Sequence, residues 1–89
     1  MADFTRDEVV AKIAAGESLE GADLNYADLR GANLERANLG RAKLSGTNLY
    51  WAYWLTSADL QGARYSGTTE WPQGFDLAET DAVLVEDDD

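Results

Sequence analysis

Leucine recurs at every fifth position through the middle of this 89-residue chain. The series runs Leu19, Leu24, Leu29, Leu34, Leu39, Leu44 and Leu49. An α-helix turns by about 100° per residue, so steps of five would scatter these side chains around the helix axis. A continuous strand would send alternate leucines to opposite faces, because five is an odd number. The chain must therefore bend once in every repeat.

Small residues accompany the leucines at fixed offsets. Alanine stands two positions before most of them, and Asp or Asn stands between the two in most repeats. Residues two apart in an extended segment point the same way, so we expect Ala and Leu to face inward together. Asp and Asn suit the bends, because their side chains hydrogen-bond to nearby backbone. The pattern predicts a coil that turns a corner every five residues.

The repeated unit Ala-(Asp/Asn)-Leu-x-x resembles the pentapeptide-repeat family from Leu19 to about Tyr65. The resemblance implies an all-β fold, a right-handed quadrilateral β-helix with four repeats in each coil. Ten units between Leu19 and Tyr65 then make about two and a half coils.

The register slips after the seventh leucine. Trp54 stands where the eighth leucine is expected, and Ala58-Asp59-Leu60 follows one residue late. We interpret the extra residue as a bulge at a corner that gives Trp54 space inside the coil. The predicted core comprises Leu24, Leu29, Leu34, Leu39, Leu44, Leu49, Trp54 and Leu60.

The two ends differ from the repeats. Thr5-Arg6-Asp7-Glu8 has the form of a capping box and predicts a helix over residues 6–15. We interpret this helix as a cap on the first coil, rather than as an element that binds a partner. The whole chain, 1–89, is then one domain with repeat coils over 17–70. Residues 71–89 form an irregular C-terminal cap and acidic tail, in which 82–85 are either an edge strand or a docked arm.

Several classes of function are excluded by composition. The chain has no cysteine and no histidine, which removes thiolate chemistry, Ser-His-Asp and Cys-His catalysis and the usual zinc sites. Because Leu and Ala are also expected to fill the coil interior and leave no concave pocket, we expect no enzyme activity, no catalytic residues, no cofactor and no metal site. No apolar run approaches a membrane span, and the first residues lack the features of a secretory signal. The expected location is cytoplasmic.

We expect the chain to be a non-enzymatic interaction or scaffold module that presents flat β-helix faces to a protein partner. The net charge is −10, and residues 71–89 contribute seven acidic side chains and no basic one. A nucleic-acid binder needs a basic stripe, so we expect no direct contact with nucleic acid. Some relatives in the family mimic DNA and bind type II topoisomerases such as gyrase, which is an alternative function here. A purely structural repeat module is a third hypothesis.

An aromatic cluster is the candidate partner surface. In a coil of about 20 residues, Tyr50, Trp51 and Tyr53 lie above Arg30, Gly31 and Asn33 and point outward. Aromatic residues are enriched at protein interfaces, so this surface is expected to bind a protein partner or a second copy of the chain. The alternative is that the C-terminal segment folds back over these rings.

Overall fold

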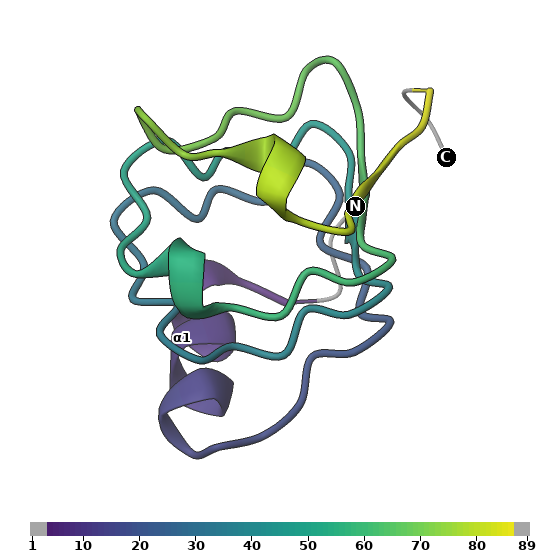
Figure 1. Cartoon of the computed structure of the whole chain (residues 1–89). Helices are drawn as coiled ribbons and strands as arrows, with labels where there is room; N and C mark the ends of the chain where they lie inside the picture. The colour runs from purple at the N-terminus through teal and green to yellow at the C-terminus, as the bar shows by residue number, and fades with distance from the viewer. Residues whose placement is uncertain (1–3, 87–89) are drawn as a thin grey trace.

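The chain is described by a computed structural model that covers residues 4–86. One helix near the N-terminus is followed by short strands (β) and 3₁₀ turns (η). These are α1 (Arg6–Ala14), β1 (Lys43–Leu44), η1 (Leu55–Ser57), β2 (Arg64–Tyr65), η2 (Leu77–Glu79) and β3 (Val83–Leu84). Between these elements the chain winds in stacked turns, with α1 at one end of the stack and η2 near the other (Figure 1). The last three residues of the predicted acidic tail, 87–89, lie outside the described residues.

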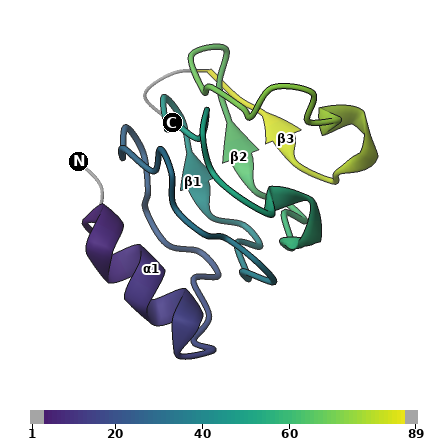
Figure 2. The same ribbon diagram turned by 90° about the vertical axis from the view of Figure 1, so that its left-hand side faces the viewer.

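Each turn of the chain is laid in parallel on the turn before it. β1, β2 and β3 form one parallel sheet in that order, and they lie side by side in Figure 2. Isolated parallel bridges join residues 20 to 22 positions apart: Asp23 to Lys43, Asp28 to Asn48, Asn33 to Tyr53, Asn38 to Asp59 and Asn48 to Glu70. The stack is therefore built from turns of about 20 residues, as four five-residue units require.

The stack continues past the last recognisable repeat. Val83 pairs with Arg64, and the N–H of Val85 donates to the carbonyl of Tyr65 at 2.7 Å. Of the two alternatives for residues 82–85, the structure shows the edge strand, which is β3. The count of repeats predicts about two and a half coils. It does not include the turn that ends in β3, because the side chains of that turn do not follow the five-residue pattern.

The corners use the short polar residues as the sequence predicts. The Oδ1 atoms of Asn33 and Asn38 each accept a hydrogen bond from the backbone N–H two residues ahead, at 3.0 and 3.1 Å. The backbone of the second residue after the leucine is often left-handed, as at Gly31 and Arg36, whose φ values are 74° and 58°. Side-chain acceptors and left-handed residues together turn the chain once per repeat.

The interior is a column of leucine and alanine. The residues buried there include Leu24, Leu29, Leu34, Leu39, Leu44, Leu49, Leu60, Ala32, Ala37, Ala42 and Ala63. Threonine replaces alanine at two inward positions, Thr47 and Thr69. Their hydroxyls donate to the carbonyls of Leu24 and Leu44 at 2.7 and 2.6 Å, so the buried oxygens are satisfied.

Trp54 is not part of this interior, so that expectation is wrong. Its side chain is 64% exposed, whereas the next residue, Leu55, is 3% exposed and takes the inward position. Trp54 has a left-handed backbone (φ 62°) and precedes η1, whose Ser57 hydroxyl donates to the Trp54 carbonyl at 2.9 Å. The extra residue therefore turns the indole outward, because the leucine-sized interior is better filled by Leu55.

Helix α1 lies against the first coil (Figure 2). Its capping box is confirmed: the Thr5 hydroxyl accepts from the Glu8 N–H at 3.2 Å, and the Glu8 carboxylate accepts from the Thr5 N–H at 2.8 Å. The helix ends at Ala14, one residue earlier than predicted. Val9 is fully buried in the common core, and Phe4, Val10 and Ile13 pack against it. Among residues 4–86, no helix is long and apolar enough to cross a membrane.

One prediction concerns the corner at Asp28. Its carboxylate accepts from the Arg30 backbone N–H at 3.2 Å and pairs with the Arg30 guanidinium at 2.7 and 2.8 Å. Asp28→Ala removes the turn acceptor and the ion pair, and we expect it to lower the free energy of unfolding by about 1 kcal/mol. Asp28→Asn keeps the acceptor, and we expect a loss below about 0.5 kcal/mol. Equal losses of unfolding free energy in Asp28→Ala and Asp28→Asn, measured by chemical denaturation, would show that the hydrogen bond in the turn does not stabilise the fold.

The same pair predicts a pH dependence. The hydrogen bonds and positive charge of Arg30 lower the pKa of Asp28 from 3.8 to about 2. A lowered pKa in the folded state means that the pair stabilises the fold above pH 3.8 and loses this effect as the pH falls toward 2. The difference in unfolding free energy between the parent and Asp28→Asn should therefore disappear over that interval.

Candidate functional site

Four outward positions within residues 50–54 form an exposed aromatic patch, which we define as Tyr50, Trp51, Tyr53 and Trp54. Their exposed fractions are 37%, 63%, 60% and 64%. Ala52, between them, is turned partly inward and packs against the core. Large aromatic side chains normally bury most of their area, so this much exposed ring surface in five residues is unusual for a small domain.

The backbone of the second coil holds the patch in place. The Tyr50 N–H donates to the Asn48 side chain at 3.0 Å, and the Ala52 N–H donates to the Leu49 carbonyl at 3.0 Å. The Tyr50 and Trp51 rings meet edge to face, with centroids 4.9 Å apart and planes at 87°. The main chain of Tyr53 pairs with that of Asn33 in the coil below. The rings are therefore presented by a rigid scaffold.

The C-terminal segment does not cover the most exposed rings. Its aromatic residues pack elsewhere: Trp71 stacks on Phe75 at 5.4 Å between centroids and meets Tyr65 of β2 edge to face at 5.5 Å. Trp71 and Phe75 also pack against the core. Of the patch, Trp54 comes near this segment, because it shares the lining of a groove of about 180 Å³ with Pro72. This second aromatic group is therefore part of the end cap.

Trp54 is the member of the patch that sequence reasoning missed. The sequence feature that could have indicated its exposure is the pair Trp54-Leu55, because Leu55 can take the inward position and leave Trp54 outside. Tyr50, Trp51 and Tyr53 are exposed, as their register in the repeat predicts.

Charged and polar residues border the patch on the coils below and above it. Beneath Tyr50 lies the Asp28–Arg30 ion pair, and Glu70 pairs with Asn48 on the coil above. Within residues 4–86, no group of three or more acidic side chains is arranged to hold a metal ion. What the patch offers is flat apolar rings with polar O–H and N–H tips, a combination suited to burial against another protein.

Comparison with known proteins agrees with this architecture. A family model for pentapeptide repeats matches residues 18–52, in eight copies. A similar solved structure is that of alr5209, a pentapeptide repeat protein from Nostoc Pcc 7120. The two chains share 22% sequence identity at a TM-score of 0.54, over 91% of this chain and 96% of that one. A search of curated proteins finds no significant match. Residues 18–52 of this chain are therefore similar to pentapeptide repeats, and its fold is similar to that of a pentapeptide repeat protein.

Proposed function

We propose that the chain is a non-enzymatic interaction module that presents the aromatic patch to a protein partner. The observation that carries this proposal is the exposure of Trp51, Tyr53 and Trp54, each at 60% or more, on a scaffold whose repeat leucines are buried. Exposed aromatic residues of this kind are typical of the central anchors of protein interfaces. A purely structural module does not need exposed aromatic side chains, because they contribute little to the stability of the fold.

We further infer that the stack is a right-handed quadrilateral β-helix, as the family implies. Four sets of bridges, at Asp23, Asp28, Asn33 and Asn38, support four sides per turn. Right-handed connections are strongly preferred between parallel strands of one sheet, which supports the handedness. Such a coil has flat sides and a regular backbone, which fixes the positions from which the aromatic side chains project toward a partner.

Mimicry of DNA is less well supported than the aromatic patch. The molecule measures 31 × 27 × 20 Å, so it is not an extended rod, whereas one turn of DNA alone is about 34 Å long. Residues 17–70 also carry five basic side chains against seven acidic ones, which breaks up any phosphate-like lattice. Inhibition of a topoisomerase by the chain would support this alternative.

The proposal is tested with the double variant Trp51→Ala/Tyr53→Ala. We expect partner capture to weaken by at least about 2 kcal/mol, or roughly 30-fold in affinity. Because both side chains are exposed, the free energy of unfolding should change by no more than about 0.5 kcal/mol. The matched control is Glu17→Ala/Glu35→Ala, at two other exposed positions, which should retain binding.

Sedimentation of the same variants distinguishes the two kinds of partner. Self-association of the parent that disappears in Trp51→Ala/Tyr53→Ala identifies a second copy as the partner. An aromatic variant that unfolds, or a control that loses as much binding, would contradict the assignment of the site.

A further inference from the structure

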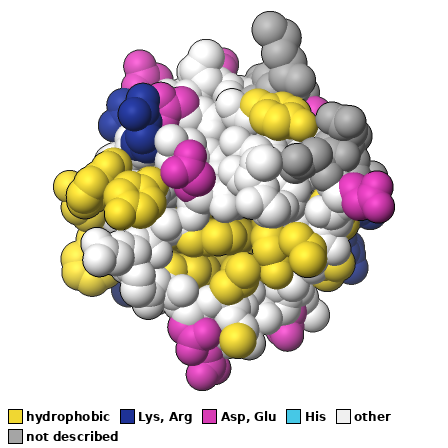
Figure 3. All heavy atoms as spheres, turned by 90° about the horizontal axis from the view of Figure 1, so that it is seen from above, with side chains coloured by type: hydrophobic (Ala, Val, Ile, Leu, Met, Phe, Trp, Pro, Cys, Tyr) yellow, Lys and Arg dark blue, Asp and Glu magenta, His cyan; other side chains and the backbone are white. Residues whose placement is uncertain are grey.

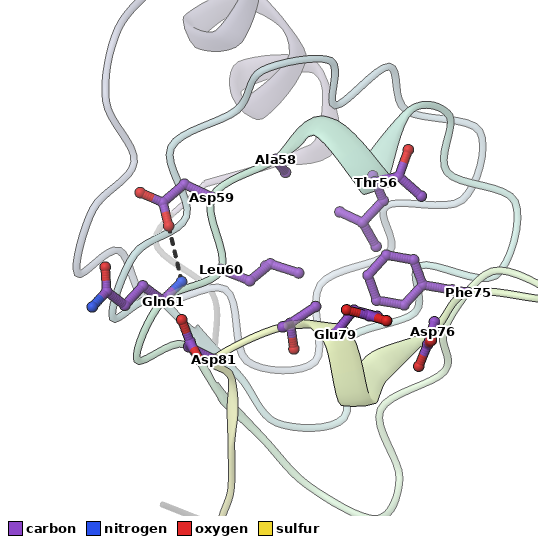
Figure 4. A pocket seen from close by; sticks show the side chains of 11 residues that line it. Thr56, Ala58, Asp59, Leu60, Gln61, Phe75, Asp76, Glu79 and Asp81 are labelled. Atoms are coloured by element: carbon purple, nitrogen blue, oxygen red, sulfur yellow. Dashed lines mark hydrogen bonds between the residues drawn. The ribbon is translucent and has the colours of Figure 1, made fainter.

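We propose that a cavity at the C-terminal end of the stack receives a lysine or arginine side chain of a partner protein. This end cavity has a volume of about 360 Å³ and lies between residues 55–61 and residues 75–81 (Figure 4). No member of the aromatic patch lines it, so it is a second surface and does not depend on the function proposed above.

The end cavity exists because the last turn of the chain swings away from the stack. Residues 76–80 leave the coil to form η2 and do not continue the regular bridges. Pairing resumes where the Gly62 N–H donates to the Asp81 carbonyl at 2.9 Å. The space is therefore bounded by backbone that is fixed on both sides, at η1 and at β3.

The floor of the end cavity is apolar. Leu55, Ala58, Leu60 and Phe75 contribute to the lining, and the side chains of Leu60 and Phe75 project toward the centre in Figure 4. Both leucines are almost fully buried, and Phe75 is fixed by stacking on Trp71. A floor of this kind suits the aliphatic stem of lysine or arginine, which packs on apolar surface while its charged head reaches out.

The rim carries only negative charge. Four carboxylates line the end cavity, those of Asp59, Asp76, Glu79 and Asp81, and the lining includes no lysine or arginine. In the described part of the chain, none of the four forms an ion pair. In the view onto this end of the stack, a band of hydrophobic side chains crosses the face, and acidic side chains, with some basic ones, lie nearer its edges (Figure 3).

Two of the rim carboxylates are held in position by the turns that they make. Asp59 Oδ1 accepts from the Gln61 N–H at 3.0 Å, and Asp76 Oδ1 accepts from the Ala78 N–H at 3.1 Å. Each keeps its second oxygen for another donor. A guanidinium or ammonium group above the floor would meet acceptors that are already oriented, which lowers the cost of ordering them on binding.

Size and charge together select the occupant. Pockets for small ligands start at about 300 Å³, so the end cavity holds about one long side chain with its neighbours. A bare metal ion would leave the apolar floor unused, and nucleic acid would be repelled by the rim. A basic side chain with an aliphatic stem matches both the floor and the rim, and a protein segment supplies it.

The test uses the full chain and a fluorescein-labelled peptide with one central arginine between leucines, measured by fluorescence anisotropy. The site variant is Asp59→Asn/Asp76→Asn/Glu79→Gln, which removes three charges but keeps acceptors for both turns. The control is Asp7→Asn/Glu17→Gln/Glu35→Gln, which removes three charges elsewhere. We expect the site variant to lose at least tenfold in affinity and the control less than twofold.

Matched ligands complete the test. The peptide with citrulline in place of arginine should bind at least tenfold more weakly, and spermidine should compete poorly because it does not place one cationic head above a fixed stem. The proposal would be overturned if the site and control variants lost the same affinity for the arginine peptide, or if the citrulline peptide bound as tightly as the arginine peptide. It would also be overturned if the arginine peptide did not bind at concentrations up to about 1 mM. Binding that is lost in Trp51→Ala/Tyr53→Ala and kept in the site variant would place the peptide on the aromatic patch and would also overturn it.

Discussion

Replacing Leu34 or Leu39 with alanine is expected to lower the free energy of unfolding by about 2–5 kcal/mol. Both side chains are fully buried, and the backbone of each is tied to the coil above: the N–H groups donate to the carbonyls of Tyr53 and Asp59 at 2.9 Å. The walls of the coil therefore cannot close around the cavity that the substitution leaves. In a domain of this size, such a loss lowers the melting temperature by roughly 8 °C or more.

Leu84→Ala is the matched control for this result. Leu84 belongs to β3 and is 62% exposed, so the same substitution should change the free energy of unfolding by no more than about 0.5 kcal/mol. The stabilities of the interior leucine variants and of Leu84→Ala are measured by thermal melting and chemical denaturation. A Leu34 variant that melts within a degree or two of the parent would refute the interior position of that leucine.

Deleting residues 1–15 is expected to cause aggregation. The deletion removes α1, and with it Val9, which is fully buried in the same core as Leu19 and Leu24. The first coil would then expose apolar side chains and an unpaired strand edge, which favours association between chains. Light scattering should increase with protein concentration in the deletion variant and not in the parent.

Substitutions on the outer surface of α1 provide the control for this deletion. Ala11 and Ala14 are exposed, so Ala11→Ser/Ala14→Ser should leave the chain monomeric. A deletion variant that stays monomeric and melts like the full chain would mean that α1 does not act as a cap.

The regular part of the fold could be predicted because local chemistry and tertiary packing agree there. The period of five requires a bend in each repeat, and Asn33 and Asn38 supply the acceptors that make it. The helix start was predictable for the same reason, since Thr5 and Glu8 satisfy each other's backbone. In these places, a few neighbouring residues determine the structure by themselves.

Prediction failed where tertiary fit decides between local alternatives. Either Trp54 or Leu55 can occupy the inward position, and only the width of the leucine-filled interior selects Leu55. For residues 82–85 the sequence left an edge strand and a docked arm as alternatives, because Val83 and Leu84 are exposed and pair with β2 through their backbone. The end cavity depends on how η2 leaves the stack, so its acidic rim was visible only as a charge imbalance.

The outward direction of Tyr50, Trp51 and Tyr53 followed from the repeat register, since stacking places these residues over outward positions of the coil below. The register did not show whether another segment covers these rings, because the positions of Trp71 and Phe75 depend on ring packing at the end of the stack. The sequence thus predicted the orientation of these three side chains but not that of Trp54, and the structure supplied their exposure.

The most direct test of the central claim is fluorine NMR of the chain labelled with 5-fluorotryptophan, before and after a captured partner is added. The three tryptophan signals are assigned with single Trp→Phe variants. We predict that Trp51 and Trp54 are sensitive to solvent in the free chain, and that Trp51 loses this sensitivity in the complex while half-buried Trp71 is unchanged. A Trp51 signal that is already protected in the free monomer, or that stays exposed in the complex, would contradict the role of the aromatic patch.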